Sequence, residues 1–169
     1  MRIQHRQTSY AKFVEIGGLE LGAIEVKPFH TSAVDIDNNI IRLGEITKRM
    51  LHVRVMKAKS SKEFVTFGVM VYGSVIKFYT HQYHLPSSST PSPSVPSYTF
   101  ELIQRCTLPT LPNTYTHMML SLEYLIFYKK LMERSLAQDN DIDKPYLYSH
   151  IGSGFSPTVT LLNLDTKPK

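Results

Sequence analysis

Glu25 and Lys27 are the residues of this chain whose types and spacing best suit chemistry on a phosphate ester. They end the apolar segment LELGAIEVKP, residues 19–28, and are separated by one valine. Because side chains alternate along a strand, both should lie on the same face. A carboxylate there can hold a hard divalent cation through oxygen, and the lysine can position or polarise a water molecule beside it.

A complete site of this kind needs a second carboxylate from the neighbouring strand. The metal could then activate water and stabilise charge on a phosphate in the transition state. The alternative is that the strand simply arrives at the surface, where Glu25 and Lys27 form an ion pair. A Glu-x-Lys tripeptide alone does not separate these two interpretations.

The elements that must position this pair form a hairpin. Residues 10–16 are strand-like, Gly17-Gly18 supplies a turn because glycine accepts positive φ angles, and residues 19–26 return as the second strand. Pro28 ends the second strand because it lacks an amide donor. Residues 1–9, which are polar and basic, should be a frayed end.

The turn fixes which residues face the site. If Gly17-Gly18 form a two-residue loop, Lys12 pairs with Ala23, and Glu15 pairs with Glu20 on the face opposite to Glu25. A slip of one residue, such as a three-residue loop would give, brings Glu15 round to the face of Glu25. Glu15 is therefore the candidate second metal ligand, and only in the slipped register.

A helix is predicted next, in residues 31–59, with Thr31, Ser32 or Asp35 as its cap. Its apolar stripe contains Ile36, Ile40, Leu43, Thr47, Met50 and Leu51. The basic residues Arg42, Lys48, Arg49 and Arg54 fall largely off that stripe, as does His52. They form either a solvated face or a surface that contacts phosphates.

The second half of the chain predicts three strands and a helix. Residues 63–85 read as two strands joined near Gly73-Ser74, and a third strand covers 97–106, after a Ser/Pro-rich surface loop at 86–97. The last helix lies within 113–138, with Asn113 or Thr114 as its cap. Its core stripe is predicted to contain Met118, Leu122, Leu125, Ile126 and Leu131. A tail, residues 138–169, follows, with a short strand predicted at 158–162.

Composition sets broad limits on the class of protein. A formal net charge of +5 is compatible with a polyanionic partner, although many basic proteins bind none. Cys106 is the only cysteine, so no internal disulfide forms, and its apolar surroundings predict a buried thiol rather than a nucleophile. No secretory signal and no run of roughly 18 apolar residues is seen, which predicts a soluble, intracellular protein without a membrane span.

These segments together resemble the core of the PD-(D/E)XK nuclease superfamily. ELGAIEVKP, RLGEITKRMLHVRVMKAKS and EFVTFGVMVYGSVIKFY are similar in order and sequence to a fungal branch of it, over residues 10–137 without the Ser/Pro loop. The resemblance implies an α/β or mixed α+β, restriction-endonuclease-like core, with a central mixed sheet flanked by helices. Active members cleave nucleic acid with Mg²⁺, so Glu25 would be the metal-binding acid and Lys27 the catalytic lysine.

The chain departs from that pattern in two places. Lys12 stands where the superfamily carries an aspartate, and only nine residues precede Tyr10, where a helix is usual, so the domain is expected to be N-terminally shortened. Three hypotheses follow: a metal-dependent nuclease acting on DNA or RNA; a non-catalytic descendant that binds nucleic acid or protein; and an unrelated α+β interaction domain. Oligomeric state is left open.

Overall fold

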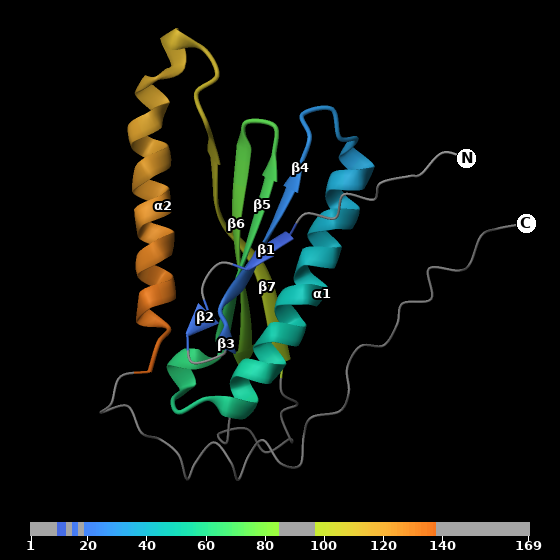
Figure 1. Cartoon of the computed structure of the whole chain (residues 1–169), viewed down its shortest axis with the longest axis vertical. Helices are drawn as coiled ribbons and strands as arrows, with labels where there is room; N and C mark the ends of the chain where they lie inside the picture. The colour runs from blue at the N-terminus through green and yellow to red at the C-terminus, as the bar shows by residue number, and fades with distance from the viewer. Residues whose placement is uncertain (1–9, 13–14, 17–18, 85–96, 138–169) are drawn as a thin grey trace, which may run out of the picture.

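A five-stranded mixed sheet forms the centre of the computed structural model, which describes residues 10–12, 15–16, 19–84 and 97–137 (Figure 1). The strand order is β1-β4-β5-β6-β7. All neighbouring strands are antiparallel except β4 and β5, which are parallel and joined by the long helix α1. The strands of this sheet are β1 (Tyr10–Lys12), β4 (Gly22–Lys27), β5 (Val65–Tyr72), β6 (Val75–His84) and β7 (Ser97–Thr107).

The predicted order of strand, strand, long helix, three strands and helix is confirmed. Each strand of the first hairpin is divided, because β2 (Glu15–Ile16) and β3 (Leu19–Glu20) pair separately in a two-stranded sheet. The predicted join at Gly73-Ser74 is also confirmed, and Gly73 has a φ of 55°, in the region that favours glycine. The mixed α/β class is thereby established.

Helix α1 (Ala33–Lys57) begins as the sequence predicts. Ser32 is its cap, and its hydroxyl accepts a hydrogen bond from the amide of Asp35. The predicted stripe faces the sheet, with Leu43, Thr47, Met50 and Leu51 buried. A short 3-10 helix, η1 (Ser61–Glu63), then leads into β5.

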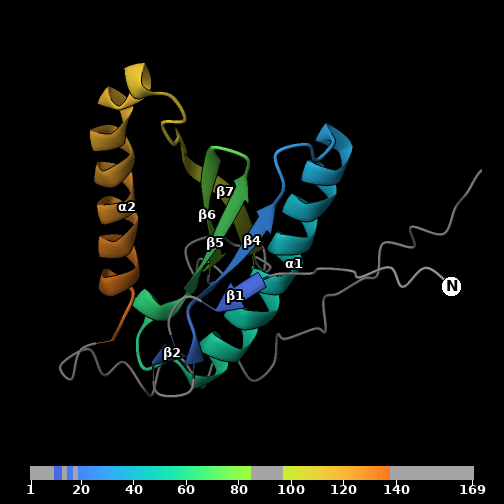
Figure 2. The same ribbon diagram turned by 45° about the horizontal axis from the view of Figure 1, so that its top comes forward.

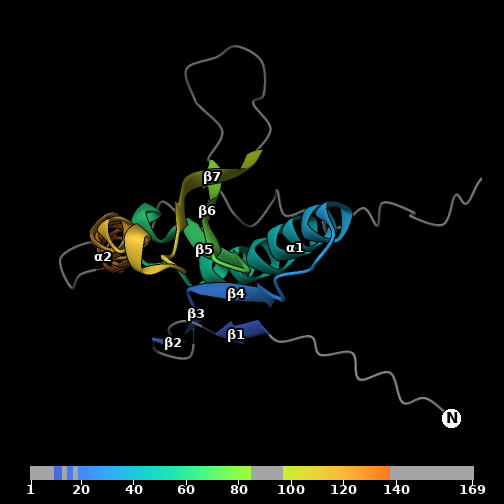
Figure 3. The ribbon, with the colours of Figure 1, turned by 90° about the horizontal axis from the view of Figure 1, so that it is seen from above.

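The two long helices cover opposite faces of the sheet (Figures 2 and 3). On one face, Ala23 and Met70 pack against α1. On the other face, Phe67 and Phe78 pack against Tyr128 of helix α2 (Thr116–Arg134). Residues on successive positions of β4 and β5 therefore contact different helices, as strand alternation requires.

The prediction for α2 is wrong in its caps and in most of its core stripe. A 3-10 helix, η2 (Pro112–Thr114), precedes α2, and the Thr114 hydroxyl bonds to the backbone of Leu111 within η2 rather than capping α2. Four of the five predicted core residues are exposed, namely Met118, Leu122, Leu125 and Ile126. Leu131 is half-buried against the core, and the buried positions of α2 are Ser121 and Tyr128.

Several predicted features lie outside the described residues. These are the frayed end at 1–9, the Gly17-Gly18 turn, the tail at 138–169 with its strand at 158–162, and the Ser/Pro loop apart from Ser97, which begins β7. Among the described helices, none combines the length and apolar character that a membrane span needs.

Candidate functional site

Glu25 lies near the end of β4, on the face that α1 covers. Its side chain is 1% exposed, and the Nζ of Lys27 lies 2.7 Å from Oε1. That contact has ion-pair distance without hydrogen-bond geometry, so neither carboxylate oxygen accepts a hydrogen bond from the described residues. Lys27 is 16% exposed and reaches solvent past the acid. The two residues thus share a face, as predicted, and are held against each other.

The strand register next to this pair agrees with the two-residue loop. Tyr10 is opposite Glu25, and Lys12 is opposite Ala23. Glu15 is opposite Glu20, so the slipped register that would bring Glu15 to the site is not formed. The prediction of Glu15 as a metal ligand is therefore not supported by the pairing.

The described residues do not fit a Mg²⁺ site. Magnesium requires near-octahedral coordination by about six oxygens, usually from one or two carboxylates together with several waters and substrate phosphates. Glu25 supplies one carboxylate that is enclosed by protein and paired with a lysine. No group of three or more His, Cys, Asp or Glu within the described ranges is arranged to hold a metal.

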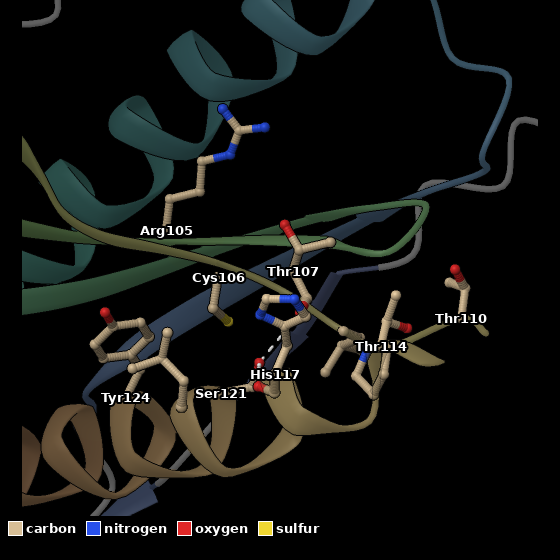
Figure 4. Close-up of a pocket in the computed structure, with 11 residues that line it drawn as sticks. Arg105, Cys106, Thr107, Thr110, Thr114, His117, Ser121 and Tyr124 are labelled. Atoms are coloured by element: carbon tan, nitrogen blue, oxygen red, sulfur yellow. Dashed lines mark hydrogen bonds between the residues drawn. The ribbon is translucent and has the colours of Figure 1, made fainter. Parts of the chain in front are cut away.

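Sheet pairing brings two further cations to the row of residues that contains Glu25. In this row, Glu25 is opposite Met70, Met70 is opposite Lys77, and Lys77 is opposite Arg105. Directly opposed residues share a face. Figure 4 shows Arg105 extending from β7 towards α1, away from the Cys106 side of the strand. We call Lys27, Lys77 and Arg105 the cationic row. The sequence alone did not indicate it, because it depends on three strand registers.

The environment of the cationic row is aromatic as well as charged. The Nζ of Lys77 lies 5.3 Å from the ring centroid of Tyr72, a cation–π contact. Burial, with smaller contributions from Tyr72 and Asp37, raises the pKa of Tyr79 to about 12. Asp37, at the start of α1, therefore adds negative charge near this face, while the Arg105 side chain remains exposed.

The basic residues predicted on α1 divide into two groups. Arg49 is exposed and Arg42 is half-buried, so both can meet a partner. Lys48 is half-buried, with its Nζ 4.8 Å from the ring centroid of Tyr98. These three residues remain candidates for phosphate contact.

The structure corrects the prediction that Arg54 can contact nucleic acid. Its side chain is 1% exposed and donates hydrogen bonds to the carbonyls of Val65 and Ser135 and to the Ser135 hydroxyl. Burial lowers the pKa of Arg54 to about 10, which leaves it charged at neutral pH. A guanidinium enclosed in this way joins α1 to β5 and to the end of α2, and is not available to a phosphate.

Two histidines of β6, His81 and His84, have structural roles. His81 is buried, its Nδ1 lies 3.1 Å from the Thr47 hydroxyl, and burial lowers its pKa to about 4. His84 is exposed and contacts Thr99, so the two histidines do not converge on a metal. Successive odd and even positions of β6 lie on different faces, which explains their separation.

A cavity of about 510 Å³ lies between the end of β7 and the start of α2 (Figure 4). Cys106 and His117 both line it. The thiol is buried, as predicted, and burial raises its pKa. The Ser121 hydroxyl donates to the carbonyls of Thr107 and His117. A protonated thiol and a bonded hydroxyl do not form a nucleophilic site.

Comparisons of the chain with family models, with curated proteins and with solved structures found no match.

Proposed function

We propose that this chain is a PD-(D/E)XK-like scaffold that binds nucleic acid without cleaving it. The observation that carries the proposal is the state of Glu25, a buried carboxylate paired with Lys27 and faced by no second acid in the register. The restriction-endonuclease-like core is part of the proposal. Its support is the arrangement of a hairpin carrying Glu-x-Lys on β4, a crossover helix, and a parallel neighbour β5.

Loss of cleavage follows from the ligands that the strands offer. A hard cation at Glu25 would have to replace Lys27 and would find one carboxylate in place of the several oxygens it needs. The position opposite Ala23 is Lys12. A positive residue at the place of the missing acid opposes a cation instead of binding it.

Binding of a polyanion is supported by the cationic row. Lys27, Lys77 and Arg105 supply three positive charges at one end of one sheet face, against the single carboxylate of Glu25. Asp37 reduces this excess without cancelling it. Phosphate contacts from lysine and arginine provide the sequence-independent part of nucleic-acid affinity. DNA and RNA are both proposed as partners, because nothing in the row reads a base or a 2′-hydroxyl.

The first test measures binding by fluorescence anisotropy with labelled single- and double-stranded DNA and RNA. The double variant Lys77→Ala/Arg105→Ala should lower the slope of log affinity against log salt by about two, at roughly one per lost phosphate contact. The matched control is Lys130→Ala/Arg134→Ala, which removes the same charge from exposed positions on α2. An equal loss in both pairs would contradict a localised binding face.

The second test measures cleavage of the same substrates with Mg²⁺ or Mn²⁺, comparing the parent with Lys27→Ala. We expect no cleavage from either protein, each shown to be folded by circular dichroism. Metal-dependent cleavage by the parent that disappears in Lys27→Ala would overturn the proposal and establish a nuclease. Absence of both cleavage and binding would instead favour a protein-interaction module on the same fold.

A further inference from the structure

The outward face of α2 is an apolar surface that no described element covers. We call it the α2 seam, and its members are exposed by 40% to 66% of their area. In Figures 1 and 3, α2 forms one margin of the described residues, with the sheet on its inner side. The members of the seam are Tyr115, Met118, Met119, Leu122, Leu125 and Ile126.

The orientation of α2 is fixed, so the seam cannot turn inward. The Tyr128 hydroxyl is buried and donates to the carbonyls of Gly68 and Tyr79, which lie on two different strands. About two helical turns earlier, the Ser121 hydroxyl donates to the carbonyl of Thr107 on β7. Turning the seam towards the sheet would break these hydrogen bonds.

The spacing of the seam is that of a helix which packs on another helix. Tyr115, Met118, Leu122 and Leu125 follow the alternating steps of three and four residues that define the a and d positions of a heptad. The six members together present roughly 600 Å² of apolar surface, against about 800 Å² contributed by each partner in a standard protein interface. The seam alone therefore supplies most of one partner's share.

Charge at the end of the seam selects the direction of packing. The next a position is Lys129, which pairs with Glu133 in its own helix at 3.0 Å. Two identical helices in parallel would place Lys129 opposite Lys129, which is repulsive. Antiparallel helices centred on Leu122 place Met118 opposite Ile126 and Met119 opposite Leu125, which matches apolar to apolar. They also place each Lys129 opposite Tyr115 of the other copy instead of opposite a second lysine.

We propose that two copies of this chain associate through the α2 seams, antiparallel and around a two-fold axis at Leu122. The same patch is then used by both copies, which is the self-complementary arrangement of a closed dimer. This surface is on the far side of α2 from the sheet, so it does not involve the cationic row and goes beyond nucleic-acid binding.

The test is the mass of the full chain in solution by sedimentation velocity and light scattering. The monomer is 19.3 kDa, and we expect twice that mass at micromolar concentration. Ile126→Glu should raise the dimer dissociation constant at least 100-fold. Ile41→Glu is the matched control, because Ile41 is similarly exposed, 58% against 53%, on the other helix. It should leave the dimer intact, with circular dichroism confirming the fold of both variants.

A second variant tests the axis itself. Leu122→Cys should give a disulfide-linked dimer on mild oxidation, because equivalent positions next to a two-fold axis come within the Cα separation that a disulfide needs. Ile41→Cys should remain monomeric on a denaturing gel. The proposal is overturned if the parent chain is still a monomer at a concentration on the order of 100 micromolar. It is also overturned if the parent is a dimer that Ile126→Glu does not weaken. A monomer that Ile126→Glu destabilises also overturns it, since the seam would then be covered within one chain.

Discussion

Replacing Lys27 with methionine tests whether Glu25 is a structural ion-pair partner. The change removes the ammonium group and keeps most of the side-chain volume. It leaves the buried Glu25 carboxylate with neither an ion-pair partner nor a hydrogen-bond donor among the described residues. We therefore expect a large loss of folding free energy at pH 7, with no change in fold.

The magnitude follows from burial. Breaking a buried ion pair by removing one partner costs about 3 to 5 kcal/mol, since the remaining charge is left in a poorly solvating environment. Lys27 retains 16% exposure, so some water reaches the pair and the lower end, about 3 kcal/mol, applies. A domain of this size typically has about 5 to 15 kcal/mol of stability in total, so the variant would lose a large fraction.

The assay is urea unfolding at 25 °C and pH 7, followed by far-ultraviolet circular dichroism. The double variant Glu25→Gln/Lys27→Met should lie within about 1.5 kcal/mol of the parent, because a neutral pair of similar volume can replace a buried ion pair. Lys129→Met is the matched control. It breaks an exposed pair with Glu133 and should cost less than about 0.5 kcal/mol.

A loss of folding free energy in Lys27→Met no larger than that in Lys129→Met would contradict this prediction. Such a result would mean that the Glu25 carboxylate is stabilised without its lysine. The acid would then be available to a cation or another ligand, and the argument against cleavage would lose its main support. A double variant no more stable than Lys27→Met would likewise show that the lost lysine acts through packing rather than through charge.

Three further changes test the core. Tyr128→Phe should cost about 2 kcal/mol in urea unfolding, because its hydroxyl donates to two strand carbonyls; a loss below 0.5 would show that those bonds contribute little. Because burial holds the pKa of His81 near 4, it is chiefly the unfolded state that takes up a proton at this residue as pH falls from 6.5 to 4, so stability should fall by about 2.5 kcal/mol across that window. His81→Gln should remove that part of the pH dependence, and an unchanged slope would refute the assignment. Gly73→Ala should lower stability by about 1 to 2 kcal/mol in thermal unfolding, since φ is positive and the new methyl would lie 2.5 Å from Phe29. Gly44→Ala, helical and in ordinary contact, is its control and should not destabilise.

The hairpin and its register were predictable because they depend on local rules. A two-residue loop fixes the pairing of the strands beside it, and strand alternation fixes the shared face of Glu25 and Lys27. The burial of Glu25 was not predictable. It depends on how closely α1 lies over β4, which is set by packing between segments far apart in the sequence.

The misassigned face of α2 has a specific physical cause. A pattern search favours the most apolar stripe, and the stripe through Met118, Leu122 and Ile126 is more apolar than the one through Ser121 and Tyr128. The latter face is buried because its hydroxyls bond to carbonyls of the sheet and the end of β7. The prediction for Arg54 failed for a similar reason. Its charge indicated an exposed position, whereas its guanidinium donates hydrogen bonds to the carbonyls of Val65 and Ser135.

The sheet separates the two surfaces proposed for binding, and this makes them independent. The cationic row lies on the α1 face, whereas the α2 seam faces away from the opposite side of the sheet. Charge variants of the row leave the seam intact, and Ile126→Glu leaves every cation of the row in place. A dimer without nucleic-acid affinity would therefore favour the protein-interaction interpretation of this fold, and a monomer that binds nucleic acid would leave the row as the functional surface.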